Sequence, residues 1–242
     1  MMGRLPCVLT TLAVVGLAAC AQGNDGKPDA RVYLDAPVDI SLVDAPPLTT
    51  LSQTTTTVLE AATAGACPAQ PSPGTAANNY YRIFDLASFG VTTDFHVYRV
   101  EFQIEHCHEF SGSSGCDVIV RVGTYGGAVA DTLTLADMVI LSSANAHIPE
   151  VIETLQPPPP TTPGGTASAN FDTNVPAGSK LLVEVDAPNG SADYALYMGA
   201  NDDGELAPAY VLTPQCNVTT PTNISTIANR PIHLLLTVSG TY

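Results

Sequence analysis

Two histidines, His106 and His108, stand one residue apart in a stretch with strand-like alternation. On a strand both would project to one face, an arrangement that some zinc and iron sites use, and Glu109 follows directly. That face is the apolar phase of the strand, His96 falls on it at the other end, and no third ligand is obvious. We therefore interpret the pair as strand-end histidines beside a disulfide, with a metal site as the alternative.

A second candidate is the acidic turn formed by Asn201, Asp202, Asp203 and Glu205 around Gly204. Such oxygen donors suit Ca²⁺, but their spacing is not that of an EF-hand loop. We expect a solvated acidic turn rather than a calcium site. The sequence thus predicts no bound metal and no cofactor.

Signals for nucleophilic catalysis are weak. Residues 111–115 read Ser-Gly-Ser-Ser-Gly, which misses the G-x-S-x-G pattern, and the strand–turn–helix context of that motif is absent. His147 and His233 are isolated. A hydrolase site assembled in space from several loops stays open as an alternative, but we predict no catalytic residues.

Sugar binding by aromatic stacking would have to rely on tyrosine, because the chain contains no Trp. In a strand, one residue of each neighbouring pair points inward and serves the core. The tyrosines that come into question are Tyr80, Tyr81, Tyr194, Tyr197 and Tyr210.

The N-terminus carries an export signal. Arg4 precedes an apolar run over residues 7–19, and the run ends in Leu-Ala-Ala-Cys at Cys20, the pattern of a lipobox. We predict a lipoprotein signal peptide over 1–19 and lipidation of Cys20. An ordinary signal peptide is the alternative, whereas the run is too short for a transmembrane helix. Ala21 stands where an aspartate would favour retention in the inner membrane, so we expect an outer-membrane location.

Composition divides the remaining chain in two. Residues 20–48 are rich in Asp and Pro with little to bury, which predicts a disordered acidic tether. Residues 49–242 are long enough for one β-sandwich domain with a substantial core. From position 60 onward the chain has 18 acidic and 5 basic residues, a difference of −13. Such a charge repels phosphate backbones, so we predict no nucleic-acid partner.

Four cysteines remain after the leader and the lipidated residue. In an oxidising compartment they are expected to form disulfides, and three pairings are possible. Cys107 and Cys116 flank a short segment between two strand-like runs, so we favour a local hairpin staple there, which leaves Cys67 with Cys216. A zinc site of thiolates is the alternative, but no C-x-x-C pair is present.

Alternating patterns predict the elements that position these residues. The clearest covers residues 95–106, and a shorter one begins at Val118. About nine strands separated by turns, without a long helix, indicate an all-β fold: an antiparallel β-sandwich, jelly-roll-like or immunoglobulin-like. A parallel β-helix is disfavoured because no repeat of constant period is visible. In the clearest strand the pattern assigns four residues to the inner face: Tyr98, Val100, Phe102 and Ile104.

Several motifs in this order resemble a bacterial extracellular β-sandwich module that occurs alone in lipoproteins and appended to secreted peptidases and other surface proteins. The resemblance covers about 49–242, and the positions of Cys67 and Cys216 fit it. It implies a fold and an extracellular location, but no catalytic residues and no agreed ligand. The motifs lie at residues 79–86, 89–91, 175–185, 198–201 and 207–210.

The sequence therefore predicts a non-enzymatic cell-surface lipoprotein that displays a disulfide-stapled β-sandwich for adhesion, assembly or protein interaction. Its membrane contact would be the N-terminal lipid anchor, and its partner an unknown protein or glycan. The alternative is a glycan-binding module, with or without Ca²⁺.

Overall fold

The computed structural model describes residues 46–112, 114–151, 164–191 and 193–242. Within it, residues 44–242 form one compact unit. Cys20, the predicted leader and nearly all of the predicted tether lie outside the described residues, as does most of the proline-rich segment at 156–165. Among the helices that are described, none has the length and apolar character needed to cross a membrane.

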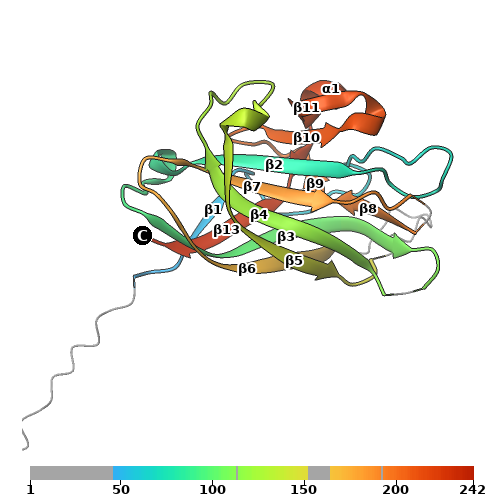
Figure 1. Ribbon diagram of the computed structural model, residues 1–242, viewed down its shortest axis with the longest axis horizontal. Helices are drawn as coiled ribbons and strands as arrows, with labels where there is room; N and C mark the ends of the chain where they lie inside the picture. The colour runs from blue at the N-terminus through green and yellow to red at the C-terminus, as the bar shows by residue number, and fades with distance from the viewer. Residues whose placement is uncertain (1–45, 113, 152–163, 192) are drawn as a thin grey trace, which may run out of the picture. The chain divides into compact units, whose positions relative to one another are not determined.

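Two antiparallel sheets make up the fold, which confirms the predicted all-β sandwich (Figure 1). The first contains β1 (Thr49–Ser52), β13 (Leu236–Thr241), β3 (Phe95–Glu109) and β6 (Gly165–Val175), with β8 (Tyr194–Met198) also paired to β3. The second contains, in spatial order, β11 (Val218–Asn223), β10 (Ala209–Thr213), β2 (Asn78–Asp85), β7 (Lys180–Ala187), β4 (Cys116–Tyr125) and β5 (Met138–Ile148).

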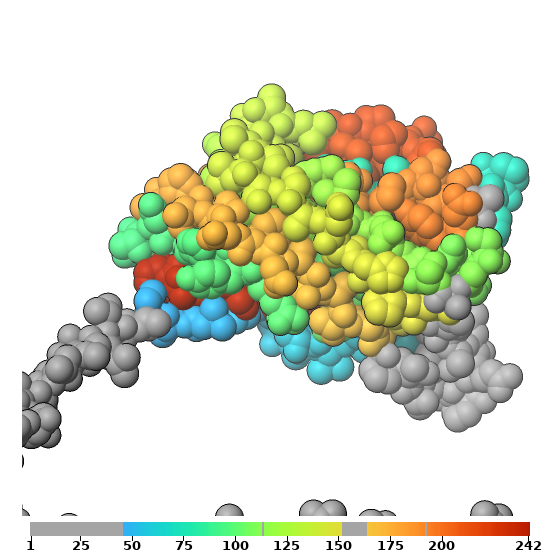
Figure 2. Space-filling model, turned by 60° about the horizontal axis from the view of Figure 1, so that its bottom comes forward, coloured from blue at the N-terminus to red at the C-terminus, as the bar shows by residue number. Residues whose placement is uncertain are grey.

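Short elements close the ends of the sandwich. A two-stranded sheet joins β9 (Ala200–Asn201) to β12 (His233–Leu234). The 3-10 helices are η1 (Leu86–Phe89), η2 (Leu135–Asp137) and η3 (Pro214–Cys216), and the α-helix is α1 (Ile224–Ala228). The strand at the start of the compact unit, β1, lies beside β13 at its C-terminal end, as the blue and red atoms of Figure 2 show.

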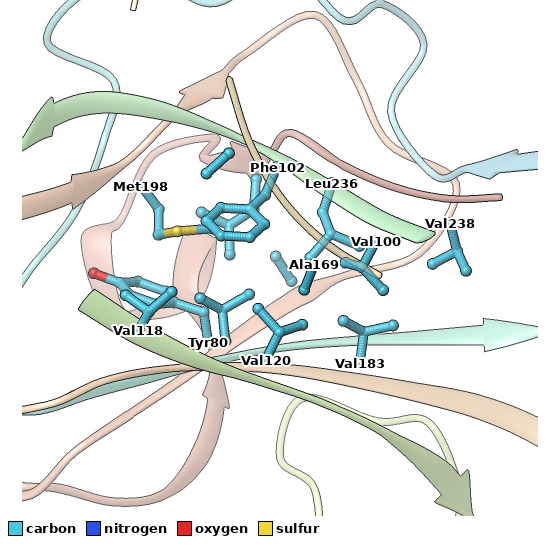
Figure 3. Packing of buried hydrophobic residues seen from close by; sticks show 14 of the residues in the cluster. Tyr80, Val100, Phe102, Val118, Val120, Ala169, Val183, Met198, Leu236 and Val238 are labelled. Carbon is cyan, nitrogen blue, oxygen red and sulfur yellow. The ribbon is translucent and has the colours of Figure 1, made fainter. Parts of the chain in front are cut away.

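The main core lies between the two sheets. Val100, Phe102 and Leu236 project from the first sheet toward Tyr80 and Val120 of the second (Figure 3). All five are at most 3% exposed. Burial of apolar side chains of this size stabilises a fold by roughly 1.5–3 kcal/mol each, so this layer accounts for the association of the sheets.

Two β-bulges in β3 change which of its residues point into the core, compared with the predicted alternation. The register against β13 shifts between Val97 and Arg99, and the register against β8 shifts between Ile104 and His106. Each bulge adds one residue and reverses the alternation. Tyr98, predicted to face inward, is therefore 42% exposed. His106, predicted to continue the apolar face, is instead half-buried, whereas the following Cys107 is fully buried.

The second sheet also carries a small core on its outer side. Tyr81, Leu182 and Tyr210 project from three neighbouring strands of this sheet, and Leu133 covers them from the loop before β5. This cover explains why β7 is apolar in both phases, with Leu181 and Leu182 fully buried. The outer core accounts for only part of the apolar run at 132–142: Leu133 is buried in it, whereas Val139, Ile140 and Leu141 are 42–56% exposed. The first part of this run is a loop and η2, and β5 begins at Met138.

The structure contains both disulfides in the favoured pairing. Cys67–Cys216, the long-range disulfide, spans 149 residues and joins the loop before β2 to η3. Cys107–Cys116, the short-range disulfide, spans 9 residues. It is not a hairpin staple, because β3 and β4 belong to different sheets. The chain crosses between the sheets at this point, so the short-range disulfide links the two layers through the core.

Candidate functional site

The histidine pair lies beside the short-range disulfide, on the outer face of β3. The rings of His106 and His108 are 6.1 Å apart, centroid to centroid. The Nδ1 atom of His108 is 2.6 Å from a carboxylate oxygen of Glu150, and the ring of His106 packs edge-on against Tyr197. In the described part of the chain, the one set of three potential metal ligands within mutual reach lies elsewhere. The pair therefore forms no three-ligand set.

Two serines of the predicted Ser-Gly-Ser-Ser-Gly stretch, Ser111 and Ser114, contact an acid rather than a histidine. The hydroxyls of Ser111 and Ser114 both donate to Glu109. These hydrogen bonds, together with one from the Ser114 amide, lower the pKa of the Glu109 carboxyl below its usual value. His147 pairs with Asp117, and His233 accepts a hydrogen bond from the Gly204 amide. None of these contacts joins a histidine to a hydroxyl nucleophile.

The predicted acidic turn is divided by the fold. Asn201 is completely buried, and its Nδ2 atom donates to the carbonyl oxygen of Val58 at 3.1 Å. Glu205 turns toward the interior and pairs with Arg82. Only Asp202 and Asp203 remain exposed, so the five residues do not converge on one point.

A third acid joins these two aspartates from a distant part of the sequence. Glu60, Asp202 and Asp203 each offer a carboxylate oxygen, all within 4.8 Å of one another. We call these three residues the acidic cluster. The Asp202 amide donates to Glu60 at 3.1 Å, which fixes this approach. Oxygen donors of this kind suit Ca²⁺. Glu60 was missed at the sequence level because 142 residues separate it from Asp202.

Most of the candidate tyrosines for sugar stacking are not exposed. Tyr80, Tyr81 and Tyr210 are at most 4% exposed. The Tyr80 hydroxyl donates to the Gly65 carbonyl at 2.9 Å, and burial raises the Tyr80 pKa. Tyr194 is half-buried and also donates to a backbone carbonyl. As expected, Tyr80 points into the main core, and Tyr81 projects to the opposite face of β2, where the outer core covers it.

An apolar pocket of about 180 Å³ lies against the long-range disulfide. Ile224, Ile227 and Ile232 line it, and the buried hydroxyl of Thr213 faces no hydrogen-bond partner there. Ligand pockets commonly have about 300–1,000 Å³. This pocket is therefore large enough for one small apolar group only.

A larger depression, about 610 Å³, opens where β2 ends and β7 begins. We call it the β2–β7 hollow. Asp85 and Lys180 face each other there as cross-strand neighbours at the ends of the two strands. The loop between β4 and β5 and the loop before β10 form its other walls. The side chains that line it are Gln53, Ile83, Asp85, Ser88, Phe89, Val129, Lys180, Leu206 and Ala207.

Gln53 lines this hollow and carries a buried, unpaired polar atom. The residue is 2% exposed, and its side-chain amide is oriented by a hydrogen bond from Nε2 to the Ile83 carbonyl at 2.5 Å. Its Oε1 atom has almost no accessible surface and no hydrogen-bond partner among the described residues. An unpaired buried carbonyl oxygen costs free energy, but a ligand in the hollow could reach this one only if neighbouring side chains moved.

A buried arginine holds one wall of the hollow in place. Arg82 is 1% exposed and projects from β2 into the interior. Its Nη1 atom is 2.7 Å from a Glu205 oxygen and 2.6 Å from the Ala207 carbonyl oxygen. Its Nη2 atom donates to Leu234. Burial lowers the Arg82 pKa and the Glu205 carboxylate raises it in part.

Sequence reasoning did not single out Gln53, Phe89 or Arg82 as functional residues. Arg82 and Phe89 lie in the motifs at 79–86 and 89–91, but nothing local marks any of the three as part of a site. No protein-family model matches the chain, and no curated protein matches it either. Its function must be argued from its own residues.

Proposed function

We propose that this chain is a non-enzymatic cell-surface lipoprotein of the outer membrane. Cys20 would carry the lipid, residues 20–48 would act as a spacer, and the β-sandwich would bind a partner in adhesion, assembly or protein interaction. The resemblance to extracellular β-sandwich modules agrees with this role. The observation that carries the proposal is the pair of disulfides, because such bonds form and persist in oxidising compartments outside the cytoplasm.

The charge distribution of the domain supports a binding role and restricts the kinds of partner. The five basic residues after position 59 all have partners within the sandwich. Arg82, Arg99 and Arg121 pair with carboxylates, while Lys180 and Arg230 donate to backbone carbonyls. With a charge difference of −13, the domain favours neutral or cationic partners and repels nucleic acid.

Metabolic labelling tests the lipoprotein assignment. The full chain is expressed in a Gram-negative host that is fed an alkynyl fatty acid, and the label is detected after cell fractionation. We expect label and membrane retention for the wild-type chain and for Cys7→Ala, which is the matched control. Cys20→Ala should lose both. Proteolysis of intact cells then reports whether the sandwich faces the outside.

Label that persists in Cys20→Ala would refute lipidation at this residue. An unlabelled wild-type chain that is released as a soluble protein would favour the ordinary signal peptide instead. Protection from protease in intact cells, with digestion only after the outer membrane is opened, would refute display at the surface.

A further inference from the structure

We propose that the β2–β7 hollow binds a neutral saccharide. This inference deepens the proposed function, because it names the class of ligand that a displayed binding module would take. It rests on three properties of the hollow: unpaired acceptors, exposed apolar surface and balanced charge. Its volume of about 610 Å³ falls within the usual range of ligand sites.

An exposed acceptor of the hollow calls for a ligand with donors. Asp85 is exposed, and its carboxylate makes no hydrogen bond or ion pair with the other described residues. Two neighbouring hydroxyls of a sugar ring can donate to its two oxygens. The Ser88 hydroxyl at the rim donates to the Asp85 backbone carbonyl at 2.7 Å, so its oxygen remains as an acceptor for a ligand hydroxyl.

The apolar part of the lining suits the C–H face of a sugar ring. Leu206 is 75% exposed and Val129 is 38% exposed, so both present apolar surface to solvent. The half-buried Phe89 also lines the hollow and packs against the core, with its ring centroid 6.0 Å from that of Phe84. An aromatic ring with one edge fixed by packing is a suitable surface for stacking.

The charges in and around the hollow favour a neutral ligand over an anionic or a cationic one. An anionic ligand would meet the negative field of the domain and the Asp85 carboxylate. A cationic peptide would be attracted by that field, but within the hollow it would meet the Lys180 ammonium group, which donates to the Gly127 carbonyl at 3.0 Å. A neutral polyhydroxyl ligand avoids both penalties and can use both charged groups, since hydroxyls donate and accept.

The test uses the full-length chain in a zwitterionic detergent that carries no sugar head group. Saturation-transfer NMR and calorimetry are run with maltose, cellobiose, lactose and diacetylchitobiose at up to millimolar concentrations, and with a lysine-rich peptide as the cationic probe. We expect at least one disaccharide to bind. Asp85→Ala should weaken that binding about tenfold, the effect of one lost charge-assisted hydrogen bond.

Two further variants complete the test: one blocks the hollow and the other is a control. Ser88→Trp places a large ring at the exposed rim and should abolish binding without touching the core. Asp172→Ala is the matched control, since its carboxylate is 92% exposed on the other sheet and its removal changes the net charge equally. It should bind like the wild-type chain. Melting temperatures of all variants show that each is folded.

The inference is overturned if no disaccharide binds, if binding survives both hollow variants, or if only the lysine-rich peptide binds. These outcomes are separate from failure of the proposed function, because the fatty-acid label and the protease assay report on the anchor and on display whether or not a sugar is bound.

Discussion

The buried ion pair between Arg82 and Glu205 should be the most sensitive polar contact in the sandwich. Replacing Glu205 with Ala leaves the guanidinium group in the interior with only the carbonyls of Ala207 and Leu234 as partners. The side chains of the pair are 1% and 13% exposed, so water cannot take over the role of the carboxylate. The charge would remain buried and uncompensated.

Removal of one partner from a buried pair costs about 3–5 kcal/mol of unfolding free energy. Arg82→Met removes the charge instead and fills part of the space. Its cost should also be about 3–5 kcal/mol, because the Glu205 carboxylate and two carbonyls lose their donors. The double variant Arg82→Met with Glu205→Ala should be more stable than the sum of the single changes by about 2 kcal/mol, because the second change no longer strands a charge.

Urea unfolding under oxidising conditions measures these free energies, with fluorescence of tyrosine and circular dichroism as independent probes. The matched control is Arg99→Met, which breaks a pair with Glu101 whose side chains are 47% and 34% exposed. This change should cost no more than about 1 kcal/mol. Additive single and double variants, or a Glu205→Ala cost as small as that of the control, would refute the view that burial makes this pair indispensable.

Three further outcomes follow from the structure. Replacing both cysteines of the long-range disulfide by Ala should destabilise the chain by about 5 kcal/mol, against about 2.5 kcal/mol for the short-range disulfide. The reason is that the first disulfide closes a loop of 149 residues and the second a loop of 9. Equal losses of unfolding free energy in urea would contradict this loop-entropy argument. Burial raises the pKa of Tyr194 and Tyr210 to about 12. The unfolded chain loses these protons from about pH 10 and the folded chain does not. The contribution of the two tyrosines to stability is therefore complete below pH 10 and lost as pH rises through 12. A tyrosinate absorbance that appears near pH 10 without unfolding would contradict these raised pKa values. Asp202→Asn should raise the unfolding free energy by about 0.5 kcal/mol in chelator, since it relieves repulsion within the acidic cluster; a loss of stability in chelator would show that repulsion is not the controlling term.

Local patterns were sufficient to predict the layers of this fold. The strand predicted from Val118 onward is β4, and Val118, Val120 and Val122 are buried in the core. The strand containing Val100 and Phe102 was also predicted, but the residues near its two ends were assigned to the wrong face of the sheet. A bulge is an insertion relative to the partner strand, so the pattern of one strand alone does not reveal it.

Strands β6 and β11 were missed for a related reason. β6 contains Ala, Ser, Thr and Asn rather than an apolar alternation, and β11 contains a proline at position 221. β6 is specified by pairing with β3, and β11 lies at the edge of its sheet, where a missing amide proton is tolerated. Propensity cannot identify a strand whose stability comes from its neighbour.

The candidate sites show the same limit more strongly. Acids close in sequence suggested a site at 201–205, yet the fold turns Asn201 and Glu205 inward and brings Glu60 to the remaining two. The β2–β7 hollow is assembled from segments as distant as Gln53 and Leu206. Only long-range pairing places them together, so no spacing in the sequence could have marked it.

The buried arginine connects the stability of the core to the shape of the hollow. Through Nη1, Arg82 binds both the Glu205 side chain and the Ala207 carbonyl, and so fixes both ends of the stretch that presents Leu206. The Leu206 amide also donates to the Gln53 carbonyl at 2.7 Å. A hydrophobic residue in place of Arg82 could fill the interior, but it could not hold this loop. A buried charge is costly inside the sandwich, but Arg82 is the residue through which the fold keeps one wall of the hollow in place.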